Sequence, residues 1–186
     1  LKAVATQLDL PITSGGGMLT MLRKPFRYGR AKFTMCVAKP AETNNPTLVD
    51  WYSKVRLRVM RQVHYSVSRP NRSIDLVLFA NGFPVATIEL KTDFTQSVIQ
   101  GQTQYGTSRL PTDPGTNKAE PLLTWGRRAL VYFVVTNEVV SMTTKLDGTS
   151  TRFLPFNRGN DGGAGNAPDP RGSDTEYFWQ DVLGRD

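Results

Sequence analysis

Two acidic residues and a lysine interrupt an otherwise apolar segment, RSIDLVLFANGFPVATIELK, at positions 72–91. The acids are Asp75 and Glu89, and the lysine is Lys91. A carboxylate enclosed among apolar side chains is costly unless a cation or good hydrogen-bond donors meet it. Two carboxylates and the backbone carbonyl of Leu90 would suit a hard divalent cation such as Mg2+, which prefers oxygen ligands and keeps several waters. The segment therefore indicates metal-assisted chemistry.

The chemistry that these groups predict is hydrolysis of a phosphodiester bond. A divalent cation lowers the pKa of a bound water and stabilises the charge that develops on a phosphate. Lys91, beside the ion, would orient the attacking water or neutralise the phosphate in the transition state. By itself, an Asp followed by Glu-x-Lys is a weak pattern, and surface charges on strand edges are the ordinary interpretation. Here the pattern follows a hairpin turn and ends an apolar strand in a basic chain. This position favours the catalytic interpretation.

The turn between the two strands decides whether Asp75 and Glu89 meet. Asn81-Gly82 is the strongest short-range hairpin signal in the chain. A two-residue loop would set Asp75 opposite Ile88, and Glu89 would then point away because strand side chains alternate. An odd-length turn, such as one of three residues, or a bulge would make the two acids diagonal neighbours on one face, roughly 7 Å apart. The metal hypothesis therefore predicts an odd-length or bulged turn.

The composition narrows the cofactors and partners. The chain has 23 Lys and Arg against 16 Asp and Glu, a net charge of +7, which favours a polyanionic partner without identifying it. A single cysteine, Cys36, and a single histidine, His64, exclude an internal disulfide, a thiolate cluster and a multi-histidine zinc site. We expect Cys36 in the core and His64 to be packed or hydrogen-bonded rather than catalytic. Any metal must be held by oxygen.

The sequence also predicts a cytoplasmic protein without a membrane segment. A single cysteine suits a reducing cytosol. No apolar run approaches the roughly 18 residues that span a bilayer, and residues 1–20 lack the pattern of a secretory leader. The first residue is Leu1, which suggests a fragment of a longer product or a processed chain.

With 186 residues and 39% apolar content, one core is expected. We expect residues 1–17, which end in a glycine run, to be a flexible lead-in, and residues 18–186 to form one domain. Apolar residues at three- and four-residue spacing predict a helix over 46–63, whose other face carries Lys54, Arg56, Arg58 and Arg61. That face is either solvated or directed at phosphates. Further helices are expected over 96–109 and 175–183, and strands over 73–79, 84–91, 129–136 and 139–145.

The run from Arg61 to Lys91 resembles the nuclease region of the restriction subunits of type I restriction-modification enzymes, members of the PD-(D/E)xK superfamily. The resemblance extends from about Leu19 through most of the chain. Its further landmarks are Gly29-Arg30-Ala31-Lys32-Phe33, Pro121-Leu122-Leu123, residues 127–131, Met142-Thr143-Thr144, residues 151–159 and residues 162–166. It implies an α/β restriction-endonuclease-like core, in which helices flank a central mixed sheet.

The resemblance also implies an activity and a set of site residues. The activity is magnesium-dependent cleavage of double-stranded DNA, with Asp75, Glu89 and Lys91 at the motif positions. A family glutamine on the next helix maps to Gln104. The family's tyrosine, four residues further on, falls on Ser108, so Tyr105 is a substitute for it.

The partners implied are the methylation and specificity subunits, of which the latter recognises the DNA sequence. No G-x-x-x-x-G-K-S/T phosphate loop occurs in the chain, so ATP hydrolysis is expected only in the motor of the full-length subunit. The family cuts only when this motor stalls on DNA.

Two other functions remain open on the sequence. One is a catalytically silent DNA-binding or assembly module of the same fold, and the other is a repair or junction nuclease of the superfamily. The three intact motif residues oppose the first, and the downstream landmarks oppose the second. Asn157 and Arg158 either contact DNA or brace a glycine-rich turn, and we favour bracing.

Overall fold

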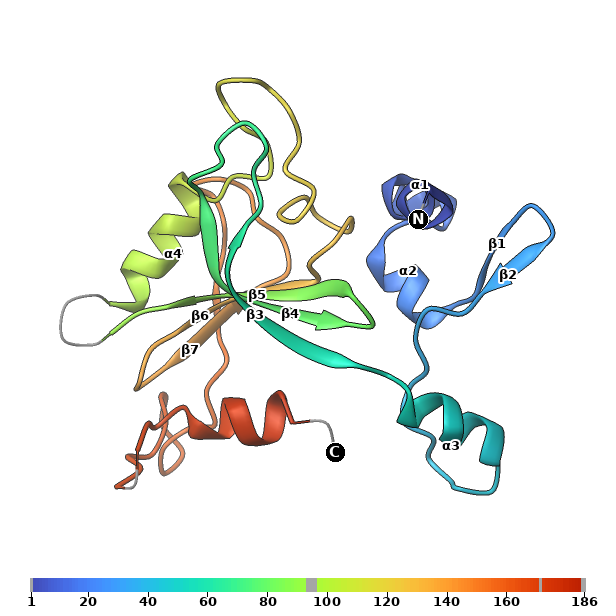
Figure 1. Cartoon of the computed structure of the whole chain (residues 1–186). Coiled ribbons are helices and arrows are strands. Elements are labelled where there is room, and N and C mark those ends of the chain that lie inside the picture. Colours follow the sequence, from blue (N-terminus) through green and yellow to red (C-terminus); the bar gives the residue numbers. More distant parts are fainter. Residues whose placement is uncertain (1, 93–96, 171, 185–186) are drawn as a thin grey trace.

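The computed structural model describes residues 2–92, 97–170 and 172–184. Its centre is a six-stranded mixed sheet in the order β3-β4-β5-β6-β7-β8 (Figure 1). The strands are β3 (Leu57–His64), β4 (Ser73–Ala80), β5 (Phe83–Leu90), β6 (Val131–Val135), β7 (Val140–Thr143) and β8 (Leu154–Pro155). β5 and β6 are parallel, and the other neighbours are antiparallel.

Helices lie on both sides of this sheet. α4 (Val98–Thr107) packs on the face that also carries Val77 and Val134, and the C-terminal helical turn Phe178–Val182 packs on the other (Figure 1). The α/β architecture expected from the resemblance is confirmed. The predicted strands and the helix after the motif are present with slightly shifted ends, while Gln96 lies outside the described residues.

The remaining elements precede β3. They are α1 (Lys2–Asp9), a short turn at Ile12–Ser14, α2 (Met18–Arg23), the two-stranded sheet of β1 (Phe26–Tyr28) and β2 (Ala31–Phe33), and α3 (Pro46–Ser53). Leu8 on α1 is buried in a cluster with Met18 and Met21. Part of the expected lead-in is therefore helical, while the division into lead-in and domain stays a prediction.

The predicted helix over 46–63 is wrong beyond Ser53. α3 begins where the Asn45 side chain accepts hydrogen bonds from the backbone N–H groups of residues 47 and 48. β3 then starts at Leu57 and pairs with β4 along its length. Apolar residues at 57, 59 and 63 fit a strand as well as a helix, and valines favour the strand. As a result, Arg58 and Arg61 project from opposite faces of β3 and form no helical stripe.

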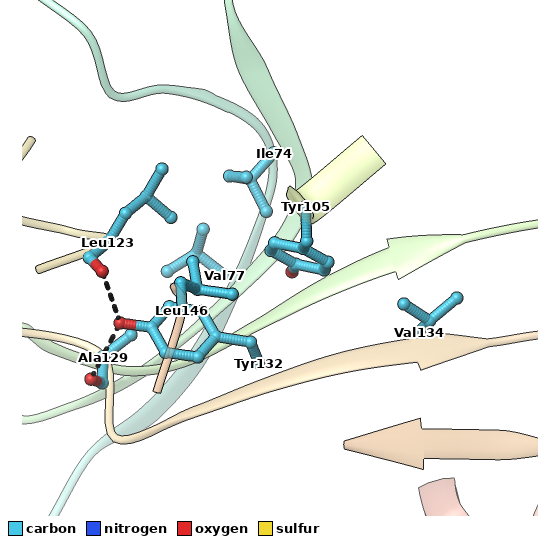
Figure 2. Close-up of a cluster of buried hydrophobic side chains, with 8 residues drawn as sticks. All are labelled: Ile74, Val77, Tyr105, Leu123, Ala129, Tyr132, Val134 and Leu146. Carbon is cyan, nitrogen blue, oxygen red and sulfur yellow. Dashed lines mark hydrogen bonds between the residues drawn. The ribbon is translucent and has the colours of Figure 1, made fainter. Parts of the chain in front are cut away.

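The core on the α4 side is shown in Figure 2. Tyr132 is buried, and its hydroxyl donates to the carbonyl of Leu123 at 3.0 Å. α4 lies so close to β6 that a Cβ on Gly101 would be 2.3 Å from Cγ1 of Val134. Gly101 therefore lets the helix approach the sheet, which a larger residue would prevent.

Two buried acids join the loop after β3 to the loop after α4. Asp113 accepts hydrogen bonds from Arg69 Nε at 2.7 Å and from the backbone N–H groups of residues 115 and 116. The hydrogen bond from Arg69 is the main cause that lowers the pKa of Asp113 to about 2. Glu120 accepts from the Ser66 hydroxyl at 2.5 Å. These bonds hold both loops beside the end of β5.

Among the described residues, no helix combines the length and the apolar character that crossing a membrane requires.

Candidate active site

The turn between β4 and β5 has two residues, followed by a bulge. Asn81 and Gly82 both have a positive φ, 50° and 85°, as a tight hairpin turn requires. Phe79 pairs with Pro84, but Leu78 pairs with Ala86, so one extra residue is inserted in β5. Pro84 has no N–H for the ladder, and proline in a sheet is tolerated at such bulges. The predicted bulge is confirmed, while the three-residue turn offered as an example is not found.

The bulge brings Asp75 and Glu89 together. The pairs Val77↔Thr87 and Leu76↔Ile88, continued by one residue, set Asp75 directly opposite Glu89 rather than diagonal to it. Residues opposite each other share a face of the sheet. The two acids and Lys91, two residues after Glu89, therefore project from the same face.

Asp75 takes the place of a backbone acceptor between the two strands. Its Oδ2 accepts from the N–H of Leu90 at 2.9 Å, and its Oδ1 accepts from Gln62 Nε2 at 3.0 Å. In a strand, the N–H and C=O of one residue point to the same edge. We therefore expect the Leu90 carbonyl to face β4 as well, on the side of Asp75.

Glu89 is buried, with an exposed fraction of 1%, and only one of its oxygens is hydrogen-bonded. Arg109 Nε donates to Oε1 at 2.9 Å, and Lys91 Nζ lies 3.8 Å from Oε2. Within the described residues, Oε2 has no hydrogen-bond partner. Burial raises the pKa of Glu89 to about 7, although Arg109 and Lys91 lower it, and the charge of Asp75 raises it further. The negative charge of the Glu89 carboxylate is therefore only partly balanced by Arg109 and Lys91.

Arg109 is the site residue that the sequence reasoning missed. It follows the C-terminus of α4, where its N–H donates to the carbonyl of Gln104 at 3.0 Å. A sequence signal existed, because Arg109 is the first basic residue after Lys91 and a buried acid needs a cation.

Gln104 lies on α4 and is partly buried. Among the described residues, no hydrogen bond joins its side chain to Asp75, Glu89 or Lys91, and its place in the site stays a prediction. Its neighbour Tyr105 is buried and shares a hydrogen bond with the Thr87 hydroxyl at 2.8 Å. Burial, and then the charge of Glu89, raises the pKa of Tyr105.

The site can be tested for its fit to a divalent cation. Over residues 2–92, 97–170 and 172–184, no three His, Cys, Asp or Glu side chains gather as a metal cluster. The available oxygens are those of two carboxylates and of the Leu90 carbonyl, which would leave several positions to water, as Mg2+ prefers. The buried Oε2 of Glu89 lacks a partner, and a cation would provide one. The residues fit such an ion.

The structure also shows the surroundings of four other residues that the sequence analysis singled out. Asn157 Oδ1 accepts from the N–H of Val140 at 2.8 Å and from the side-chain amide of Asn166 at 3.2 Å, so it braces the glycine-rich segment 162–166. Arg158 pairs with the exposed Asp181 of the C-terminal helical turn, and its predicted bracing of the glycine-rich turn stays a prediction. His64 Nδ1 lies 2.6 Å from a backbone carbonyl oxygen, as expected for a hydrogen-bonded residue. Cys36 is only half-buried, so its expected place in the core is wrong.

Comparison with known proteins gives one family. The model of the family described as "Type I restriction enzyme R protein N terminus" matches residues 28–151, which is 124 of the 186 residues. This range includes Gln62, Asp75, Glu89, Lys91 and Arg109. No curated protein and no solved structure matches the chain.

Proposed function

Because the chain belongs to the family of type I restriction enzyme R protein N-terminal domains, we propose that it is a magnesium-dependent nuclease that hydrolyses double-stranded DNA. The observation that carries this proposal is the buried, half-satisfied carboxylate of Glu89, with Asp75 and Lys91 on the same face. We propose that the nuclease works in the cytoplasm with methylation and specificity subunits and with an ATP-hydrolysing motor.

Asp75, Glu89 and the carbonyl of Leu90 would hold the ion. When bound, it would supply a water of lowered pKa and stabilise charge on the phosphate. Asp75 is already oriented, because its two oxygens are held by the N–H of Leu90 and by the side-chain amide of Gln62. Glu89 is held at Oε1 by Arg109, which leaves Oε2 for the ion.

Lys91 is the group that can act on the substrate. Its N–H donates to the carbonyl of Val135 at 2.9 Å, so its backbone is tied to the central strand β6. Its side chain is mostly buried, and its ammonium group lies 3.8 Å from Glu89 Oε2. From this position it can donate a hydrogen bond to a phosphate oxygen or orient a water, which stabilises the developing charge.

The proposal is tested by Asp75→Asn in the R subunit of the assembled enzyme, with ATP hydrolysis and DNA cleavage measured on the same sample. We expect cleavage to fall about a hundredfold, a typical loss for an electrostatic catalytic group, because an amide keeps one oxygen ligand but not the charge. ATP hydrolysis should be unchanged, since its phosphate-binding loop lies outside these residues. Equal cleavage by both proteins would reject the nuclease assignment and leave a silent DNA-binding or assembly module.

Arg109 provides a second test, because it positions Glu89 without touching the ion. Arg109→Met leaves Oε1 without its donor, and we expect metal affinity to fall about 10- to 100-fold, as is typical for residues that orient metal ligands. Arg109→Lys should recover part of this loss. The measurement is a Mn2+ titration of the purified chain followed by electron paramagnetic resonance, with circular dichroism as the control for folding. Unchanged affinity in Arg109→Met would show that Arg109 does not orient the ligand.

A further inference from the structure

β1 and β2 form a basic hairpin that projects beside the sheet (Figure 1). We use "basic hairpin" for residues 23–33, whose cations are Arg23, Lys24, Arg27, Arg30 and Lys32. All five are exposed, and no acidic residue occurs between Asp9 and Glu42. Within the part of the chain that the structure describes, none of the five forms an ion pair.

The register of the basic hairpin places two cations against each other. Arg27 is the direct cross-strand partner of Lys32. Like charges in this position destabilise a strand pair, and an isolated two-stranded hairpin is marginally stable in water. The hairpin is held from its other side by Phe26 and Phe33, whose rings stack at 5.2 Å. An anion lying across Arg27 and Lys32 would remove their repulsion.

Two neighbouring open hollows, each lined in part by basic residues, lie beside the base of the basic hairpin. One hollow of about 390 Å³ is lined by Lys32, Trp51 and Lys54, and a neighbouring one of about 670 Å³ by Arg23, Lys32 and Trp51, among others. Trp51 is 48% exposed. Lys54 is paired with Asp50 at 2.6 Å and so contributes less charge. The basic residues thus form a continuous surface from the hairpin to α3.

The helix before the basic hairpin contacts a loop that packs on the active-site face of the sheet. The N–H of Met18 donates to the carbonyl of Gly126 at 2.9 Å, and the neighbours of Gly126, Leu123 and Ala129, pack in the same cluster as Val77. Val77 shares its face with Asp75, because the two lie two positions apart along the strand.

The basic hairpin is anchored near the other end of β5, where Phe83 packs against its cluster. From Phe83 to Glu89 the strand advances about 20 Å. At 3.4 Å per base pair, this length corresponds to about six base pairs of a DNA duplex. Arg58 is exposed between the two ends, on the face of Asp75, since it pairs with Phe79. One duplex is therefore long enough to span from the basic hairpin to the end of β5 that carries Glu89.

We propose that the basic hairpin binds the phosphate backbone of duplex DNA about six base pairs from the phosphate that is cleaved. This inference rests on the proposed nuclease function, but it uses none of the residues of the metal site. The phosphate oxygens lie between Arg27 and Lys32, and Arg23 and Arg30 extend the contact along one strand.

The experiment is a titration of a fluorescein-labelled 25-base-pair duplex in EDTA, followed by fluorescence anisotropy at several salt concentrations. In Arg27→Gln/Lys32→Gln we expect affinity to fall about tenfold or more, and the slope of log K against log salt to drop by about 1.8, or 0.9 per lost phosphate contact. The Tm should stay unchanged or rise, because the like-charge pair is removed. Misfolding cannot produce this combination of weaker binding and an equal or higher Tm.

The matched control is Lys118→Gln/Lys145→Gln, which removes the same charge from two exposed lysines in the loops after α4 and β7. We expect it to bind nearly as well as the wild type. An equal loss in both double variants would overturn the proposal, because net charge alone would then explain binding. The proposal would also be overturned if the wild-type chain bound vesicles containing anionic phospholipid but did not bind the duplex.

The two hypotheses fail in different ways. If the hairpin variant binds weakly while Asp75→Asn still cleaves, the DNA-binding surface stands and the proposed metal site fails. If the hairpin variant binds normally while Asp75→Asn loses cleavage, the metal site stands and the surface is rejected.

Discussion

Replacing Glu89 with glutamine is expected to reduce DNA cleavage about a thousandfold and to abolish tight Mn2+ binding. Arg109 Nε donates to Oε1 at 2.9 Å and will keep the amide oxygen as its acceptor. The amide NH2 group then occupies the position of Oε2, and it carries hydrogen atoms instead of a lone pair for the ion. A metal ion contributes several kcal/mol to phosphate chemistry, and about 4 kcal/mol corresponds to a thousandfold in rate.

The matched control for this prediction is Glu120→Gln. Glu120 is also buried, but it accepts a hydrogen bond from Ser66 and contacts none of the three motif residues in the described structure. It should cleave DNA and bind Mn2+ as the wild type does. Cleavage is measured in the assembled enzyme with Mg2+ and ATP, and Mn2+ binding in the purified chain. If Glu89→Gln binds Mn2+ normally, Glu89 is not a ligand.

Replacing Lys91 with methionine is expected to reduce cleavage by about 100- to 1000-fold, the usual loss when one group that stabilises transition-state charge is removed. Methionine keeps a similar length in a position that is mostly buried. Mn2+ affinity should be unchanged or slightly higher, because a positive charge 3.8 Å from Oε2 of Glu89 is removed. Glu89→Gln and Lys91→Met should thus differ in metal binding while both lose cleavage.

Lys91→Arg serves as the conservative comparison and should recover part of the activity, since it restores the charge with a different shape. Parallel losses of cleavage and metal affinity in Lys91→Met would contradict the proposed role. They would indicate that Lys91 stabilises the carboxylate of Glu89 and does not act on the substrate.

Residues 54–63 show where the sequence pattern was insufficient. Their apolar spacing fitted a helix, yet β3 forms because β4 offers a complete partner along its length. The N–H of Arg56 also donates to the Asn81 side chain at 2.7 Å, which fixes the start of β3 beside the hairpin turn. These partners lie 9 to 25 residues further along the chain, and a local pattern carries no information about them.

The sequence by itself determined the hairpin around Asn81-Gly82 and the alternation that puts Glu89 and Lys91 on one face, because both depend on neighbouring residues. Only the tertiary structure decided that Asp75 lies opposite Glu89 and that Arg109 holds one of its oxygens. The first depends on a bulge that shifts the register by one residue. The second depends on how closely α4 packs on β6. Residue types and spacing offered the bulge as one of the possible turns and Arg109 as a nearby cation, but long-range packing selected both.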